Sequence, residues 1–430
     1  MVGGDTIRTD LIKGSPTGWA RAGEPNEFPK SGPAGLAAVL DAAARWRRFA
    51  PLLARLFAAE IPTGVIESPL AAIPRLVVRH AHARAPLLLS QRVFLKADHA
   101  LPLGGSIKAR GGLYAVLCIA ERAALSAGLL RPGDDYASLA GAQARECFAA
   151  KRISVGSTGN LGIAVGLAAR ALGFQAEVHM SHDAKEWKKA RLRAIGVSVV
   201  EHRADYTSAV SAARDLADAL PEAHFIDDER STDLFHGYAA GAPHLAQQLL
   251  ERGVNISAEH PLCVHLPCGV GGAPGGVLFG LRAVLGAHVW GFFAEPTASP
   301  CMLMRLLGYP ASASVYDLGL DNQTAADGLA VARASDFAFE QVGAQVMGAY
   351  TLTDAQMFSW LAAAHVEESL RLEPAAAAGF GALDILWRHP AFAPLRTRLA
   401  GATHIIWTTG GATLPDPEFA ALLARAHSPP

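Results

Sequence analysis

A single lysine stands between two glycine pairs in the stretch LGGSIKARGG, residues 103–112. Glycine lets the backbone approach a ligand closely, and the amine of a lysine is a nucleophile that reacts with carbonyl compounds. Lys108 is therefore either the reactive group of a ligand site or a solvated lysine beside a turn, since glycines also favour turns.

A second small-residue loop, GSTGNLG at residues 156–162, follows the apolar stretch ISV and precedes a helical pattern. The backbone N–H groups at a helix start, together with hydroxyls, form a natural site for a carboxylate. An ordinary helix N-cap by Ser157 or Thr158 is the alternative interpretation.

A glycine-rich loop, PCGVGGAPGG at residues 267–276, follows the apolar stretch LCVHL. Such a loop before a helix is typical of a phosphate-binding site. It lacks the GK[ST] ending of a nucleotide P-loop and fits the dinucleotide GxGxxG pattern poorly. We expect a phosphate on something other than a nucleotide, with a plain tight turn as the alternative.

Two further loops carry polar side chains at strand ends. Glu295 follows VWGFF and could face a ligand or a cation, or lie at an exposed strand end. Thr408 and Thr409 follow HIIW and precede two glycines; a hydroxyl there can pair with a ring nitrogen, or be structural. The order of these features along the chain indicates the cofactor pyridoxal phosphate. Its aldehyde would take the lysine, its substrate the carboxylate loop, its phosphate the glycine-rich loop and its ring nitrogen the hydroxyl.

The elements that carry these loops alternate between strand and helix. Strands are predicted at RVFLKA, ISVGS, AEVHM, VSVVEH and HFID, with helices over residues 107–128, 159–173, 184–196 and 206–220, and a second series runs through PLCVHLPCG, VWGFFAEP and HIIWTTGG. This alternation predicts βαβ units and parallel sheets, whose functional loops lie at the carboxyl ends of the strands.

The bulk composition narrows the class of protein. The chain has 430 residues, 51% of them hydrophobic, and this length predicts two domains. Its net charge of -1 predicts no affinity for nucleic acid or an anionic membrane. Five cysteines without CxxC spacing suggest neither a disulfide framework nor a zinc site. The first 20 residues lack the apolar core of a signal peptide. A cytoplasmic location is predicted.

Several longer segments resemble one family. GSIKARGG, SVGSTGNLG, WKKARLRAIGVSVVE, FIDDE, LPCGVGGAPGGV, FFAEPTASPCM, DNQTAADGLAV, RLEPAAAAG and WTTGGATLP are similar, in this order, to the fold type II pyridoxal-phosphate enzymes of the tryptophan synthase β group, and within it to the bacterial D-serine dehydratase (D-serine ammonia-lyase) family. The resemblance covers about residues 92 to 415. The sequence departs from the family at Gly104, where serine is expected, and in the loop TGGAT.

The resemblance implies an α/β fold of two open twisted domains with the cofactor in the cleft between them. We expect a large cofactor-binding domain at residues 1–107 and 236–430 and a small α/β domain at residues 108–235.

The resemblance also implies roles for single residues. Lys108 would hold the cofactor as a Schiff base and act as a general base. Asn160 would bind the phenolic oxygen of the cofactor ring, Thr409 would face the pyridine nitrogen, and the phosphate would be bound by Gly269, Val270, Gly271 and Gly272. The substrate carboxylate would be held by Ser157, Thr158 and Gly159, with Thr158 also counted among the catalytic residues. Asp228 would contact the substrate hydroxyl or amine and take part in catalysis. Glu295 and Cys301 would belong to a K⁺ or Na⁺ site.

The implied activity is a lyase reaction that converts D-serine to pyruvate and ammonia, with D-threonine as a further candidate substrate and a monomer or homodimer as the active form. An L-serine/L-threonine dehydratase or a β-replacement enzyme on the same scaffold is the alternative. Outside this class, the chain could be a ligand-binding or regulatory protein that kept the scaffold, or a nucleotide-binding enzyme, although the missing GK[ST] motif weakens the last interpretation.

Overall fold

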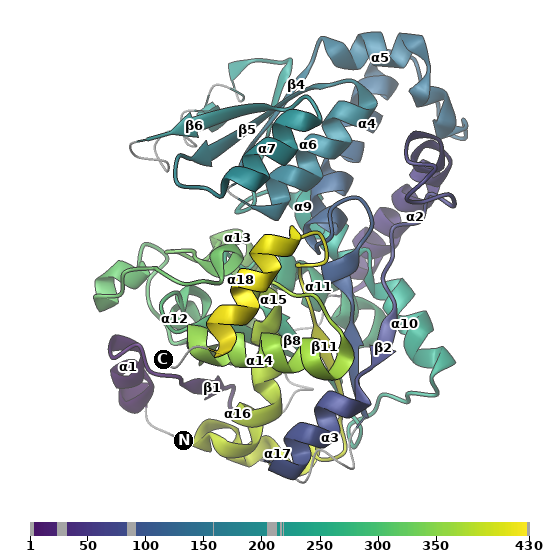
Figure 1. The fold of residues 1–430 in the computed structure, drawn as a ribbon. Helices are drawn as coiled ribbons and strands as arrows, with labels where there is room; N and C mark the ends of the chain where they lie inside the picture. The colour runs from purple at the N-terminus through teal and green to yellow at the C-terminus, as the bar shows by residue number, and fades with distance from the viewer. Residues whose placement is uncertain are drawn as a thin grey trace. The chain divides into compact units, whose positions relative to one another are not determined.

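The computed structural model describes residues 4–23, 32–83, 92–157, 159–203, 213–215, 217 and 219–427. The chain forms two compact units, one made of residues 1–37, 68–100 and 242–430 and the other of residues 38–67 and 101–241 (Figure 1). The second unit contains the whole predicted small domain, residues 108–235, and extends beyond both of its ends. The helix predicted over residues 206–220 lies largely outside the described residues.

The second unit is built on a four-stranded parallel sheet with the strand order β6-β5-β4-β7. Its strands are β4 (Arg152–Gly156), β5 (Gln175–Ser181), β6 (Ser198–His202) and β7 (Ala223–Ile226). Each strand begins within a few residues of its prediction. Between β4 and β5 runs α6 (Asn160–Leu172), which ends at Gly173 with a left-handed φ of 103°, as expected of a C-terminal glycine.

Two glycines let α6 lie close to its neighbours. A Cβ on Gly162 would lie 2.8 Å from Val178 in β5, and one on Gly166 would lie 2.8 Å from Val197. The four-residue spacing places both glycines on one face of α6. The GNLGIAVG pattern thus serves helix–sheet packing as well as the loop before it.

Among the described residues, five further α-helices belong to this unit: most of α2 (Gly32–Leu56), α4 (Tyr114–Ser126), α5 (Ala142–Ala149), α7 (Glu186–Ala194) and α9 (Thr232–Ala239). Of these, α4 and α9 pack against the π-helix that follows Lys108. The helix predicted over residues 107–128 begins as a π-helix, Ala109–Leu113, directly after Lys108 and continues as α4. Single π-turns of this kind are frequent at functional sites.

The first unit holds a seven-stranded sheet with the order β1-β10-β9-β8-β11-β3-β2. Its five central strands are parallel, and the short edge strands β1 (Gly18–Ala20) and β2 (Leu70–Ala72) pair antiparallel. The central strands are β3 (Arg92–Lys96), β8 (Leu262–Pro267), β9 (Val289–Pro296), β10 (Val346–Leu352) and β11 (Thr403–Trp407). Every residue of β8 to β11 is buried, which explains their continuous apolar runs. The sequence interpretation missed β10.

Helices flank this sheet: α1 (Gly4–Ile12), α3 (Pro74–Ala83), α10 (Ala242–Glu251), α11 (Gly272–Leu285), α12 (Cys301–Leu306), α13 (Asp336–Val342), α14 (Asp354–Glu368), α15 (Pro374–Ala377), α16 (Ala382–Arg388), α17 (Arg396–Leu399) and α18 (Asp416–His427). Within the described ranges, no helix is long and apolar enough to cross a membrane.

Candidate active site

Lys108 is paired with a carboxylate from 120 residues further along the chain. Its Nζ donates to Asp228 at 2.7 Å and 3.1 Å from the two carboxylate oxygens. Both side chains are largely buried, with 20% and 27% of their surface exposed. The structure therefore brings together two of the residues selected from the sequence, and Lys108 is no free surface lysine beside a turn.

The surroundings change the proton affinity of Lys108. Burial lowers the pKa of the ammonium, but attraction to Asp228 and the neighbouring Tyr238 outweighs it, and the pKa lies above its ordinary value. Only a neutral amine attacks a carbonyl carbon. The Asp228 carboxylate therefore favours the protonated form of Lys108, and it is placed to accept this proton when the amine has to be neutral.

Tyr238 is a site residue that the sequence interpretation missed. Its ring centroid lies 5.8 Å from the Nζ of Lys108, and burial raises the pKa of its phenol above the ordinary value. A tyrosine within HGYAAG carries no local signal of this role, because only the docking of α9 brings it to Lys108.

The glycines after Lys108 serve packing between helices. A Cβ on Gly111 would lie 2.4 Å from the Cζ of Tyr238, and one on Gly112 would lie 3.1 Å from Ala164 of α6. Close approach of the backbone to a ligand was one of the two interpretations of these glycines from the sequence, and a turn was the other. The structure shows that Gly111 and Gly112 admit α9 and α6 instead, which fixes the start of the helix after Lys108.

The two aspartates of FIDDE differ in their partners. Asp227 forms an ion pair with Arg214 at 2.7 Å and accepts a hydrogen bond from the backbone N–H of Glu229. Asp228 instead faces Lys108. Asp227 therefore holds the turn after β7, and Asp228 is the one available for chemistry.

The predicted carboxylate loop joins β4 to α6. The hydroxyl of Ser157 accepts a hydrogen bond of 3.1 Å from the backbone N–H of Gly159, and α6 begins at Asn160. The first N–H groups of a helix have no acceptor within the helix and favour an anion. Thr158 lies outside the described residues.

In the other unit, the glycine-rich loop joins β8 to α11. Gly271 caps α11 with a φ of 104°, and a Cβ there would lie 2.3 Å from the Cε of Met302. A Cβ on Gly269 would lie 3.1 Å from backbone atoms of Gly328 and Leu329. These glycines therefore let the loop pack closely against Met302 and residues 328–329. The first amide groups of α11, which begins at Gly272, have no acceptor within the helix and favour an anion.

The two threonines after β11 are distinguished by their hydrogen bonds. The Thr408 hydroxyl is buried, lies 2.8 Å from Nδ1 of His99 and donates to the carbonyl of Lys96. Thr409 is half-buried, and its hydroxyl makes no hydrogen bond to the described residues. Thr408 is structural, whereas Thr409 retains a hydroxyl for a ligand.

Glu295 lies at the end of β9 with no exposed surface. Its two oxygens accept hydrogen bonds of 2.8 Å from the amides of Met302 and Leu303. Burial raises its pKa to about 8, although these amides partly offset the shift. The thiol of Cys301 donates to the carbonyl of Gly269, and burial raises its pKa. Among the described residues, no group of three or more His, Cys, Asp or Glu side chains is arranged to hold a metal ion.

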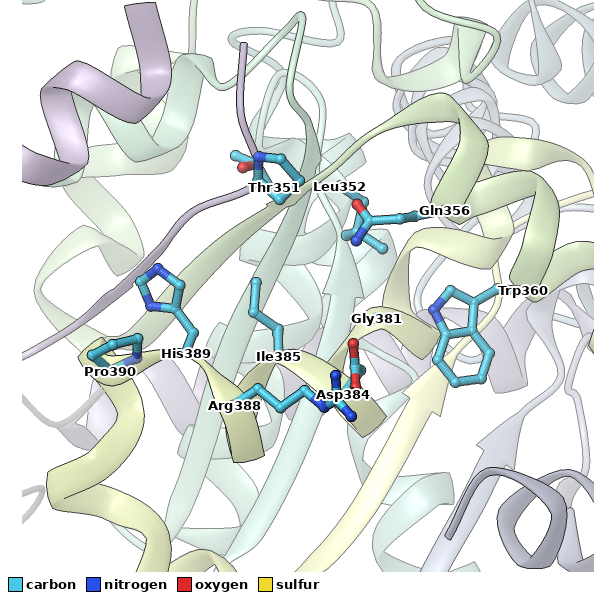
Figure 2. Close-up of a pocket in the computed structure, with 11 residues that line it drawn as sticks. Thr351, Leu352, Gln356, Trp360, Gly381, Asp384, Ile385, Arg388, His389 and Pro390 are labelled. Carbon is cyan, nitrogen blue, oxygen red and sulfur yellow. Dashed lines mark ion pairs between the residues drawn. The ribbon is translucent and has the colours of Figure 1, made fainter. Parts of the chain in front are cut away.

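A separate pocket of about 280 Å³ lies in the first unit beside α14 and α16. Figure 2 shows the ring of Trp360 on one wall and the ion pair of Asp384 and Arg388 on another. None of the candidate residues above lines it.

Comparison with known proteins decides the family. The pyridoxal-phosphate dependent enzyme family matches residues 65–395. The chain belongs to this family. The enzyme is 50% identical over 401 residues to a probable D-serine dehydratase of Chromobacterium violaceum, covering 92% of this chain and 89% of the relative. It is 47% identical over 432 residues to a probable D-serine dehydratase of Pseudomonas putida, covering 98% and 96%.

Solved structures share the fold of this pyridoxal-phosphate enzyme. Diaminopropionate ammonia lyase from Escherichia coli in complex with D-serine matches with a TM-score of 0.69 at 19% identity, over 96% of this chain and 98% of the other. The processed form of threonine deaminase isoform 2 from Solanum lycopersicum matches with a TM-score of 0.63 at 18% identity, over 95% and 100%. The predicted fold class is confirmed.

Proposed function

We propose that the enzyme is a lyase that converts D-serine to pyruvate and ammonia. The observation that carries this proposal is the identity of about half of all residues, over nine-tenths of the chain, to proteins named as probable D-serine dehydratases. The pairing of Lys108 with Asp228 supplies the acid–base group that an elimination requires.

The residues present suit pyridoxal phosphate. The glycine-rich loop at residues 269–272 and the start of α11 would hold its phosphate, Thr409 its ring nitrogen, Asn160 its phenolic oxygen and Lys108 its aldehyde. When bound, this cofactor stabilises negative charge at the substrate Cα.

The protein groups then move protons around the substrate. The amine of Lys108 is placed to take a proton as a general base, and Asp228, 2.7 Å away, stabilises the resulting ammonium. The proton that Lys108 takes from the substrate would pass through Asp228 to the departing β-hydroxyl, which leaves as water. Ser157, Thr158, Gly159 and the N-terminus of α6 hold the substrate carboxylate. Aminoacrylate released from the enzyme hydrolyses to pyruvate and ammonia.

The decisive assay follows pyruvate from D-serine and L-serine separately, together with the visible absorption of the bound cofactor. Pyruvate from D-serine alone supports the proposal. Pyruvate from L-serine would instead identify an L-serine/L-threonine dehydratase, and a cofactor band without pyruvate from either form would favour a β-replacement enzyme. Lys108→Ala should abolish turnover while leaving the fold intact; near-normal turnover by this variant would refute the role of Lys108.

We also infer a monovalent cation at Glu295 and Cys301, because a buried carboxylate is stabilised in its charged form by a cation. Replacing K⁺ and Na⁺ by a large organic cation should then reduce activity, and unchanged activity would count against the site.

We further propose D-threonine as a second substrate. We propose that the active form is a cytoplasmic monomer or homodimer and that neither nucleic acid nor a membrane is a partner. Cell fractionation and light scattering test the location and the oligomeric state.

A further inference from the structure

A buried lysine lies beside the loop that is proposed to hold the substrate carboxylate. Only 3% of Lys188 is exposed, and its Nζ lies 3.8 Å from the position that a Cβ on Gly159 would take. Lys188 is in the first turn of α7, which follows β5, and Gly159 follows the neighbouring parallel strand β4. The ammonium therefore lies at the carboxyl edge of the sheet, beside the start of α6.

The next residue, Lys189, is equally buried and provides a comparison. Its exposed fraction is 2%, and its Nζ donates to the carbonyl of His182 at 2.6 Å and to Glu201 at 2.7 Å. Lys189 is thus bound to the segment before α7 and to β6. The two adjacent lysines point to different surroundings, and of the two only Lys188 lies against the carboxylate loop.

The positive charge of Lys188 lies where other positive charge is already present. A cation in the first turn of a helix is unfavourable, because the N-terminus already carries partial positive charge, and burying an ammonium costs further free energy. The start of α6 adds a second helix N-terminus a few ångströms away. The ammonium lies 5.6 Å from the ring centroid of Trp187, a contact that leaves its positive charge in place. This charge and the N-terminus of α6 both attract an anion to the start of α6.

We propose that Lys188 binds the carboxylate of the substrate and makes the enzyme selective for amino acids over amines without a carboxylate. This inference rests on the proposed function, since the carboxylate loop is part of it. Lys188 takes no proton from the substrate. It supplies a charge-assisted hydrogen bond to the carboxylate, beside the amides of the loop.

The test compares D-alanine with D-alaninol, in which a hydroxymethyl group replaces the carboxylate; neither carries the β-hydroxyl of D-serine. Their dissociation constants from the holoenzyme are measured by the change in cofactor absorption. Lys188→Met should reduce the preference for D-alanine over D-alaninol about 10- to 100-fold, as expected for loss of one hydrogen bond to a charged group. The KM for D-serine should rise by a similar factor while kcat changes little.

Lys189→Met is the matched control. It should lower the melting temperature, because Glu201 loses its partner, but leave the D-alanine preference within about twofold of the wild type. Lys188→Arg keeps the charge and should retain most of the preference. If Lys188→Met yields no folded protein, the preference for D-alanine over D-alaninol is measured for Lys188→Gln instead.

The outcomes separate the two proposals. If the wild type releases pyruvate from D-serine and Lys188→Met keeps the full preference for D-alanine, the role of Lys188 is refuted and the proposed function stands. If the wild type neither releases pyruvate from D-serine nor binds D-alanine, both proposals fail.

Discussion

At the scale of single residues, the environment separates side chains that look alike in the sequence. Asp227 and Asp228 are adjacent, but only Asp228 faces Lys108. Thr408 and Thr409 are adjacent, but only Thr408 is bound to His99 and the Lys96 carbonyl. In each pair one residue supports the fold and the other is left for chemistry, because alternate residues at a strand end face opposite sides.

The Asp228–Lys108 pair leads to the first prediction. Asp228→Asn removes the charge that raises the pKa of Lys108, so the pKa of the lysine should fall. The kcat for D-serine should fall about 10²- to 10⁴-fold, the usual contribution of a general acid–base group. Steady-state kinetics against pH measure both effects. Asp227→Asn is the control: it should cost stability through Arg214 and leave the pH profile in place. An Asp228→Asn enzyme with the wild-type kcat would contradict the role of Asp228.

At the scale of elements, glycines set how closely helices approach the site. The π-helix after Lys108 contacts α9 through Gly111, and α6 contacts β5 through Gly162. The loop before α11 turns at Gly271. Each of these contacts positions one predicted site group, so a methyl group at these glycines should disturb function and stability together.

The contact of Gly111 with α9 gives the second prediction. Gly111→Ala places a methyl group 2.4 Å from Tyr238 and should reduce the free energy of unfolding by about 1–3 kcal/mol through overpacking. Urea unfolding measures it. Gly104→Ala is the matched control in the same segment, because its Cβ would lie 3.6 Å from Ala109, an ordinary contact. Equal free energies of unfolding of the two variants would show that α9 shifts to make room for the methyl group without cost.

The start of α11 gives the third prediction. Gly271→Ala and Gly286→Ala both force alanine into a positive φ, 104° and 84°, at opposite ends of the same helix. Both should lower the melting temperature, but only Gly271→Ala should weaken binding of pyridoxal phosphate, by about tenfold or more. Equilibrium dialysis of the folded proteins measures the affinity. Equal affinities in both variants would place the phosphate elsewhere.

At the scale of the whole molecule, buried histidines couple stability to pH. Burial lowers the pKa of His404 and of His99 to about 4 and holds that of His265 well below its ordinary value. Nε2 of His265 lies 3.0 Å from Nδ1 of His404, an arrangement in which the accepting ring must be neutral and both rings cannot be protonated. All three histidines are therefore neutral in the folded protein at neutral pH.

The fourth prediction follows from the sign of these shifts. Their stabilising effect is present above the unfolded-state pKa of about 6.5 and is lost as the pH falls from there towards 4, by up to about 3 kcal/mol for His404. Glu295 acts in the opposite sense, because its raised pKa costs stability as the pH rises from 4.5 towards 8. Between pH 6.5 and 5 the three histidines outweigh the one glutamate, so acid should destabilise the enzyme.

Urea unfolding at several pH values tests this prediction against His404→Gln, which removes one titrating ring. The slope of the unfolding free energy between pH 6.5 and 5 should be smaller in the variant by about 1 kcal/mol per pH unit. An identical slope in both proteins would show that His404 does not control the acid response.

The sequence by itself determined the local features of this protein. Strands, helices and the loops between them follow from periodicity, glycines and apolar runs, so ISVGS, AEVHM and HIIW were predicted at nearly their observed bounds. Lys108 was singled out by its flanking glycines. The family followed from the order of longer segments, and the family match agrees with it. β10 was missed because its run, VMGAYTL, carries no loop with evident chemistry.

Only the tertiary structure decided which distant groups meet. The Lys108–Asp228 pair spans 120 residues of chain, and the choice of Asp228 over Asp227 depends on which side of the turn after β7 faces Lys108. Tyr238 reaches Lys108 only through the docking of α9, and Lys188 reaches Gly159 only through the packing of α7. Local signals depend on backbone dihedrals and side-chain spacing, which neighbouring residues fix. Contacts between remote side chains depend on strand order and helix packing, which no short stretch of sequence contains.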